Sequence, residues 1–147
     1  MSTTNFIFPV NLGLVLINIK EDKLLLIILA ELLYKVLINA CCFENCKFIS
    51  GDVFTKLDEF DAEGIEPDVI ILDPPRVGVG EKALTKILKY NVKNIVYVSC
   101  NPKSLAQDLR LLEMNGYAVE KVCCVDMFPQ TPHVEVVTLL TKVVKSS

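Results

Sequence analysis

The sequence has no long apolar run, no glycine-rich phosphate-binding turn and no cysteine spacing typical of a metal site. Its longest unbroken apolar run, Leu24 to Ala30, has seven residues, whereas a membrane-spanning helix needs roughly 20. The start of the chain lacks the basic residues of a secretory signal. The six cysteines form no paired CxxC pattern and no plausible disulfide framework. These absences predict a cytoplasmic protein with no membrane span and no bound metal.

An excess of basic residues is also absent. Lysine and arginine number 15 against 18 aspartates and glutamates, a formal charge of −3, so binding of nucleic acid by bulk charge is not expected, although a local basic patch is compatible with it. Hydrophobic residues make up 52% of the chain and charged residues 22%, which excludes disordered, collagen-like and coiled-coil proteins. The length of 147 residues predicts a single domain. Within it, residues 1–46 are atypical and residues 47–147 are clear in pattern.

In the clear part, segments typical of buried strands alternate with segments typical of helices. Strands are expected over 47–50, 68–72 and 94–99, and helices over 53–62, 81–90 and from Pro102 to Asn115-Gly116. Two further strands, 117–126 and 134–142, follow with no helix between them. The pattern predicts an α/β fold with a mostly parallel sheet and a C-terminal antiparallel hairpin. In the atypical part we expect a strand over 12–19 and a helix over 24–38.

Asp73 directly follows a buried strand and precedes the stiff pair Pro74-Pro75. In open α/β sheets, ligands bind at the carboxyl ends of the strands, so this carboxylate is a candidate ligand-binding group. An ordinary turn with a solvated aspartate explains the position equally well.

Cys100 also follows a buried strand, in Ser99-Cys100-Asn101-Pro102 just before a helix. The helix dipole and the free N–H groups at that end stabilise a thiolate, the nucleophilic form of cysteine. The alternative is a small buried apolar side chain, which is what most free cysteines are.

The only histidine, His133, lies near Glu135 at the start of the last expected strand. Residues two apart on a strand share a face, so the two side chains could point the same way. Cys100 and His133 could form the catalytic pair of a cysteine hydrolase. Alternatively, His133 caps the turn and Glu135 is a solvated strand residue.

Together these clusters resemble the catalytic domain of RNA uracil 5-methyltransferases. The matching segments are DPPRVG at 73–78, YVSCNPKSLAQDL at 97–109 and VDMFPQTPHVEVV at 125–137. They occur in the family's order and at about its spacing, and the combination of SCNP with FPQTxHVE is highly specific. The resemblance covers about residues 39–142. It implies a Rossmann-like class I methyltransferase fold and, in the cell, tRNA modification or rRNA processing.

The resemblance also implies roles for single residues. Cys100 matches the nucleophile, whose thiolate adds to carbon 6 of uracil and so makes carbon 5 reactive toward the methyl group of S-adenosylmethionine. Glu135 matches the base that removes the carbon-5 proton. Asp73 matches an aspartate between cofactor and uracil, and Asp52 matches a cofactor contact. The substrate would be a uridine in tRNA or 23S rRNA, flipped out of its stack, and His133 would support the loop.

The chain departs from the family where the cofactor's glycine-rich turn, resembling DLYCGTG, is expected. Upstream of residue 39 there is one glycine, Gly13, and no recognisable acidic strand end. We therefore expect either a fragment of a larger enzyme or a degenerate paralogue, with S-adenosylmethionine binding that is weak or absent by calorimetry. The alternative function is a non-catalytic RNA-binding or interaction module. An exposed apolar N-terminal surface would also favour self-association.

Overall fold

The computed structural model describes residues 8–9, 13–17, 50–51, 53–127 and 129–143. Its elements are β1 (Phe8–Pro9), β2 (Gly13–Ile17), β3 (Ser50–Gly51), α2 (Val53–Glu63), β4 (Val69–Asp73), α3 (Glu81–Leu88), β5 (Asn94–Ser99), α4 (Pro102–Met114), β6 (Tyr117–Val125) and β7 (Glu135–Lys142). The helices and strands predicted from residue 53 onward are all confirmed, with ends that differ by at most two residues. The predicted helix over 24–38 lies outside the described residues, as does most of the strand expected over 47–50.

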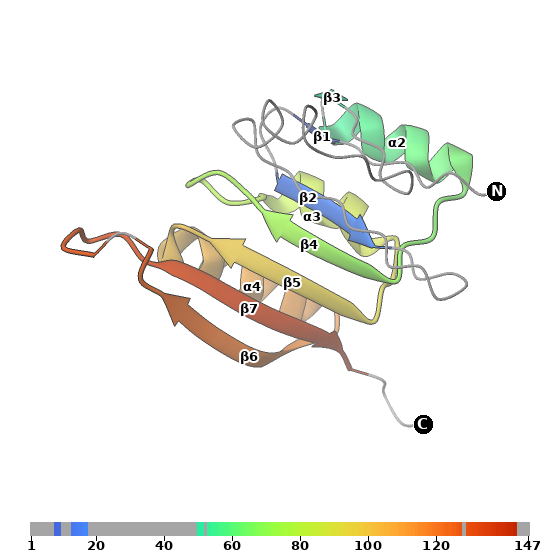
Figure 1. The fold of residues 1–147 in the computed structure, drawn as a ribbon. Coiled ribbons are helices and arrows are strands. Elements are labelled where there is room, and N and C mark those ends of the chain that lie inside the picture. The colour runs from blue at the N-terminus through green and yellow to red at the C-terminus, as the bar shows by residue number, and fades with distance from the viewer. Residues whose placement is uncertain (1–7, 10–12, 18–49, 52, 128, 144–147) are drawn as a thin grey trace.

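Five strands form one sheet in the order β2-β4-β5-β7-β6 (Figure 1). β4 and β5 are parallel, whereas β2 is antiparallel to β4 and β7 is antiparallel to both β5 and β6. The α/β class and the C-terminal antiparallel hairpin are therefore confirmed, but the sheet is mixed rather than mostly parallel. Two causes combine: β7 follows β6 without a crossover helix and inserts between β6 and β5, which makes both of its pairings antiparallel, and β2 pairs antiparallel with β4.

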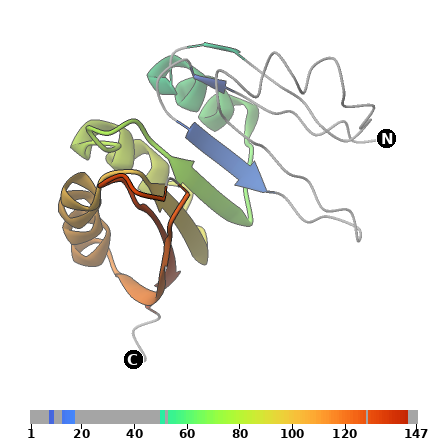
Figure 2. The same ribbon diagram turned by 60° about the vertical axis from the view of Figure 1, so that its left-hand side comes forward.

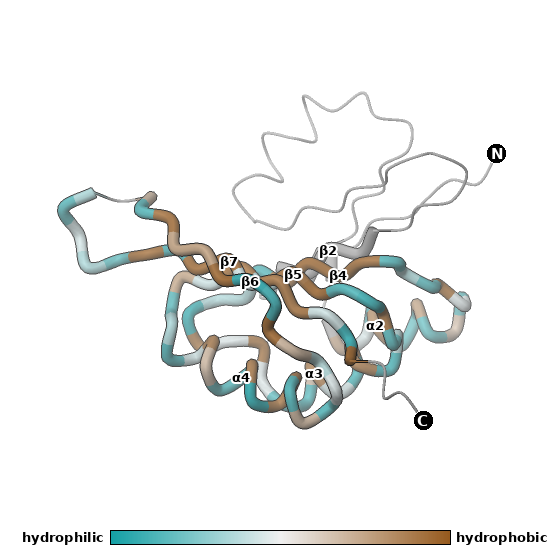
Figure 3. Tube along the Cα trace, turned by 90° about the horizontal axis from the view of Figure 1, so that it is seen from below, coloured by the Kyte–Doolittle hydropathy of each residue, from teal (hydrophilic) through white to brown (hydrophobic). Residues whose placement is uncertain are grey.

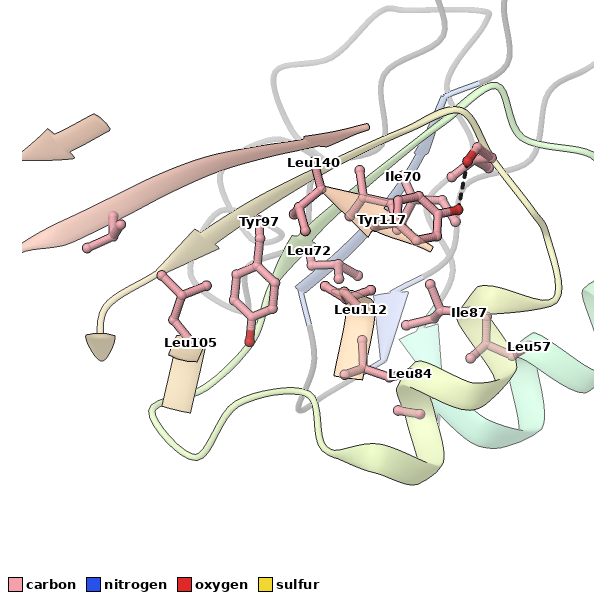
Figure 4. Packing of buried hydrophobic residues seen from close by; sticks show 14 of the residues in the cluster. Leu57, Ile70, Leu72, Leu84, Ile87, Tyr97, Leu105, Leu112, Tyr117 and Leu140 are labelled. Carbon is pink, nitrogen blue, oxygen red and sulfur yellow. Dashed lines mark hydrogen bonds between the residues drawn. The ribbon is translucent and has the colours of Figure 1, made fainter. Parts of the chain in front are cut away.

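Helices α2, α3 and α4 lie on one side of this sheet (Figures 2 and 3). Apolar side chains of the helices and of the strand faces beneath them form the core, in which Leu84, Leu112 and Leu140 are at most 1% exposed (Figure 4). The phenol of Tyr117 donates a hydrogen bond of 2.7 Å to the Val92 carbonyl within this layer. Along β5, buried residues alternate with half-buried ones, so the side of the sheet away from the helices is less completely covered.

The start and end of α4 follow the signals in its sequence. Asn101 is the N-cap, and its side-chain oxygen accepts a hydrogen bond of 3.2 Å from the Lys103 N–H. Pro102 occupies the first turn, where a missing N–H costs nothing. The helix ends at Met114 with Asn115 as its C-cap, and Gly116 has φ +86°, the left-handed conformation that terminates helices. The position of this N-terminus matters for the site described below.

In the described part of the core, one buried side-chain hydroxyl has no hydrogen-bond partner. Thr138 on β7 is fully buried, and within the described part of the chain its Oγ1 has no hydrogen-bond partner. Because an unpaired buried hydroxyl is destabilising, we expect Thr138→Val to raise the free energy of unfolding by about 1 kcal/mol. Urea unfolding measures this. Thr138→Ser, which keeps the hydroxyl and loses the methyl group, is the control and should be less stable than wild type; equal stability of the Thr138→Val variant and the wild type would contradict the expectation.

No helix among the described residues is long and apolar enough to cross a membrane.

Candidate active site

Strands β4 and β5 end and β7 begins at one edge of the sheet (Figure 1), and three of the four predicted site residues belong to these strand ends: Asp73, Cys100 and Glu135. Leu72 pairs with Tyr97, and Asp73 is the next residue of β4. Ser99 pairs with Val136, so Cys100 follows β5 at the level where Glu135 starts β7. Three segments far apart in the sequence thus bring Asp73, Cys100 and Glu135 to the same edge, as the strand-end argument predicted.

The charge of Glu135 acts on the carboxyl of Asp73. Although Asp73 is exposed at the end of β4, partial desolvation raises the pKa of its carboxyl above the usual 3.8, and repulsion from the Glu135 carboxylate raises it further. Two carboxylates that repel each other at a strand edge favour a cationic ligand between or beside them. A carboxyl whose pKa is raised by burial and by a neighbouring carboxylate, as for Asp73, is common at functional sites.

The raised pKa of Asp73 has a consequence for stability. A carboxyl with a raised folded-state pKa contributes stability that is fully present below about pH 3.8 and is lost as the pH rises through the folded-state value. We therefore expect Asp73→Asn to be more stable than wild type at pH 7, by about 1–2 °C in Tm because solvent screens most of the interaction. The gain should vanish toward pH 3.5. Thermal unfolding across this range tests it, and an advantage of wild type that grows with pH would refute it.

Cys100 lies in a tightly held turn at the start of α4. The buried Ser99 hydroxyl donates to the Asn101 carbonyl at 3.0 Å and accepts from the Asn101 N–H at 3.1 Å. The Asn101 carbonyl also accepts hydrogen bonds from the Ser104 hydroxyl and the Leu105 N–H. Cys100 itself is a free thiol, half-buried between these fixed neighbours. Its backbone position is consequently well defined, and the residue is not fully buried.

The loop from Pro74 to Gly80 is tied to the same turn. The side-chain amide of Asn101 donates a hydrogen bond of 2.7 Å to the Arg76 carbonyl. One residue therefore both caps α4 and joins the loop after Asp73 to the turn that carries Cys100. The hydrogen bond from the Asn101 side chain to Arg76 therefore joins the DPPRVG segment to the segment that contains SCNP.

The remaining predicted residues have different outcomes. Asp52 lies outside the described residues. His133 is exposed and precedes β7, so the shared-strand-face argument that paired it with Glu135 is wrong; its N–H donates to Thr131 Oγ1 at 3.3 Å within the loop. Among the described residues, no cluster of side chains suits a metal ion.

Sequence reasoning missed Asp108 and Gly78. Asp108 is 4% exposed and accepts hydrogen bonds from the Val79 N–H at 2.7 Å, the Gly80 N–H at 3.3 Å and the Tyr97 phenol at 2.5 Å. The available signal was an aspartate three residues after Leu105 and four before Leu112, on the buried stripe of the helix.

The fold and this strand edge define the chain as a Rossmann-like methyltransferase domain. Over 75% of this chain, it is similar to the crystal structure of a Pyrococcus abyssi tRNA (uracil-54, C5)-methyltransferase in complex with S-adenosyl-L-homocysteine, with a TM-score of 0.55 and 30% identity, covering 25% of that chain. A Streptococcus pneumoniae protein, a putative tRNA (m1A22) methyltransferase, has a TM-score of 0.51 at 16% identity, which supports the fold alone.

The family model for tRNA (Uracil-5-)-methyltransferase matches residues 36–143. The chain therefore belongs to the tRNA (uracil-5-)-methyltransferase family. An RNA methyltransferase from Clostridium tetani, named as uncharacterized, is 54% identical over 98 residues, which are 67% of this chain and 21% of that protein. A relative from Caldanaerobacter subterraneus is also 54% identical, again over 67% of this chain and 21% of its own length. The chain thus spans about a fifth of the length of these curated relatives.

Proposed function

We propose that this chain supplies the reaction residues for S-adenosylmethionine-dependent methylation of carbon 5 of uridine in RNA. The observation that carries the proposal is the convergence of Cys100, Asp73 and Glu135 at one sheet edge. A nucleophile, a base and a further carboxylate at one strand edge suit a reaction that needs covalent activation and proton removal at neighbouring ring atoms.

The covalent step is assigned to Cys100. Its thiolate adds to carbon 6 of uracil, and the electron pair of the carbon 5–carbon 6 double bond moves to the carbonyl oxygen at carbon 4, giving an enolate. The enolate makes carbon 5 a nucleophile toward a methyl group. The partial exposure of Cys100 and the hydrogen-bonded Ser99–Asn101 turn support this role, because a nucleophile must be both reachable and fixed in position.

The proton step is assigned to Glu135. After carbon 5 has been methylated, Glu135 accepts the proton from that carbon, the carbon 5–carbon 6 double bond forms again, and the sulfur of Cys100 leaves as thiolate. The products are 5-methyluridine in the RNA, S-adenosylhomocysteine and one proton. Glu135 begins β7 beside the end of β5, and this placement supports its reaching the same uracil ring as Cys100.

The cofactor's charge fits the described part of the site. S-Adenosylmethionine carries a sulfonium and an ammonium cation, and it supplies the methyl group when bound. Desolvation and Glu135 raise the pKa of Asp73, and a neighbouring positive charge would stabilise its ionised carboxylate. Asp73 is accordingly the described residue we assign to cofactor binding, and Asp52 is a second candidate from the family resemblance. The substrate class is RNA with an unstacked uridine in tRNA or 23S rRNA.

The proposal is tested by methyl transfer from labelled S-adenosylmethionine, at millimolar concentration, to unmodified tRNA and 23S rRNA transcripts. Nuclease digestion and mass spectrometry should identify 5-methyluridine as the labelled nucleoside. Label at another atom or nucleoside would overturn the assignment to carbon 5. RNA binding without any label transfer would favour the alternative, a non-catalytic RNA-binding module.

A further inference from the structure

The loop that follows Asp73 is held against the first two turns of α4 by Asp108. The described hydrogen bonds of this loop within itself are few: the Gly78 N–H donates to the Pro75 carbonyl at 2.8 Å. Its other anchors come from outside, from Asn101 at one end and from Asp108 at Val79 and Gly80. The loop conformation therefore depends on these two residues of the α4 segment.

Gly78 shows how closely the loop approaches Asp108. A Cβ atom at this position would lie 2.7 Å from Asp108 Oδ2 and 3.2 Å from the Ser104 Cβ. The residue also has φ +88°, a conformation that favours glycine. Glycine is thus needed here both for its backbone angle and for the contact with Asp108. The loop can approach α4 this closely because Gly78 has no side chain at the point of contact.

Burying the carboxylate of Asp108 has a desolvation cost that an apolar side chain would not have. The residue is almost fully buried, and none of the ion pairs among the described residues involves it. Its carboxylate is instead satisfied by three donors, two from the loop and one from Tyr97. Burial and the bond to Asp108 raise the pKa of Tyr97, so its phenol stays a donor. An apolar side chain would fill this space at lower desolvation cost but could not hold the loop.

We propose that Asp108 is a positioning residue that fixes Asp73 relative to Cys100. The tether runs from Asp73 through the loop to Val79 and Gly80, then through the Asp108 carboxylate into α4, whose N-cap adjoins Cys100. This inference rests on the proposed function for its effect on catalysis. The tether itself can be tested without any reaction.

The first test follows the titration of the Asp73 carboxyl by NMR in the complete chain. In Asp108→Ala the freed loop should leave the already exposed Asp73 more fully solvated, so its pKa should fall toward 3.8, and the Val79 and Gly80 amides should exchange with solvent at least about tenfold faster. Asp108→Asn keeps an acceptor oxygen, so the Asp73 pKa and the exchange rates of the two amides should lie between those of wild type and Asp108→Ala. If Asp108→Ala does not fold, the same measurements on Asp108→Asn test the proposal. Tyr97→Phe leaves both backbone bonds and should leave the Asp73 titration unchanged.

Leu112→Ala is the matched control, because it destabilises the same helix in the core away from the loop. It should lower Tm without changing the Asp73 titration. The proposal is overturned if Asp108→Ala and Asp108→Asn leave Asp73 and the two amides unchanged, or if Leu112→Ala changes them equally.

The second test measures the rate of adduct formation with 5-fluorouridine RNA, per folded molecule. We expect Asp108→Asn to lower this rate about 10- to 100-fold with little change in the RNA concentration needed for half saturation. A wild-type chain that forms no adduct contradicts the proposed function. In that case the Asp73 titration and the amide exchange alone test whether Asp108 holds the loop. A variant rate equal to that of an active wild type overturns the positioning role.

Discussion

Replacing Cys100 by alanine is expected to abolish covalent capture of RNA that contains 5-fluorouridine. With wild-type chain and S-adenosylmethionine, the thiolate adds to carbon 6 and methylation follows, but fluorine cannot leave carbon 5 as a proton would. The thiolate is then unable to depart, and a protein–RNA complex should survive denaturing electrophoresis. Without the sulfur no bond can form, so the Cys100→Ala variant should lose at least about a thousandfold of the capture yield and of methyl transfer.

The chain offers matched controls for this experiment. Cys123 and Cys124 are exposed free thiols on β6, so they are more accessible to a reactive RNA than the half-buried Cys100. Alanine at either position should leave capture unchanged. Capture that persists in Cys100→Ala, or that disappears with Cys123 or Cys124, would show that the adduct arises from general thiol reactivity. Reversible binding that is equal in wild type and Cys100→Ala would instead support the non-catalytic RNA-binding module.

The strand ends that carry the site could be predicted because their signals are local. The run Asp68 to Leu72 stops at Asp73-Pro74-Pro75, and the run Asn94 to Ser99 stops at Cys100. Apolar runs of this length bounded by proline or a capping residue specify strand ends directly. Parallel neighbours then have their carboxyl ends at the same edge. The approach of Asp73 and Cys100 follows from these two facts without knowledge of any contact.

The order of the strands could not be read in the same way. The sequence indicates that β6 and β7 pair with each other, but the insertion of β7 beside β5 depends on contacts between residues far apart in the chain, such as Ser99 with Val136. The expectation of a mostly parallel sheet failed partly for this reason and partly because β2 pairs antiparallel with β4. The shared strand face for His133 and Glu135 failed because β7 begins only at Glu135. Their relation depends on where β7 begins, and strand ends are less certain than strand centres.

Asp108 illustrates a second limit. Its place on the buried stripe of α4 is visible in the sequence, but periodicity cannot say whether a buried aspartate is satisfied or by what. The donors are backbone N–H groups of Val79 and Gly80, which any residue type except proline carries. Only the folded chain shows that the loop after β4 supplies them. Positioning residues that act through backbone groups are therefore found from structure, whereas nucleophiles and bases can be proposed from side-chain type.

Replacing Glu135 by glutamine is expected to stop the reaction after methyl transfer rather than before it. Glutamine is nearly the same size and cannot accept the carbon-5 proton, so Cys100 should stay bonded to carbon 6 of a methylated ring. Ordinary uridine RNA should then give a stable protein–RNA complex that carries one labelled methyl group. Multiple turnover should fall by about 10²–10⁴-fold, the usual contribution of a general base.

The same substitution removes the negative charge that helps to raise the pKa of Asp73. We expect the Asp73 titration to move toward its ordinary value in Glu135→Gln, which provides a check that the variant is folded and that the two carboxylates are neighbours. Glu113→Gln, an exposed change on α4, is the control and should leave both turnover and the Asp73 titration unaltered. A Glu135→Gln chain that turns over normally, or that is blocked without accumulating a methylated complex, would remove Glu135 from the role of base. Because the two carboxylates begin and end different strands at one edge, the experiment also tests whether that edge acts as a single site.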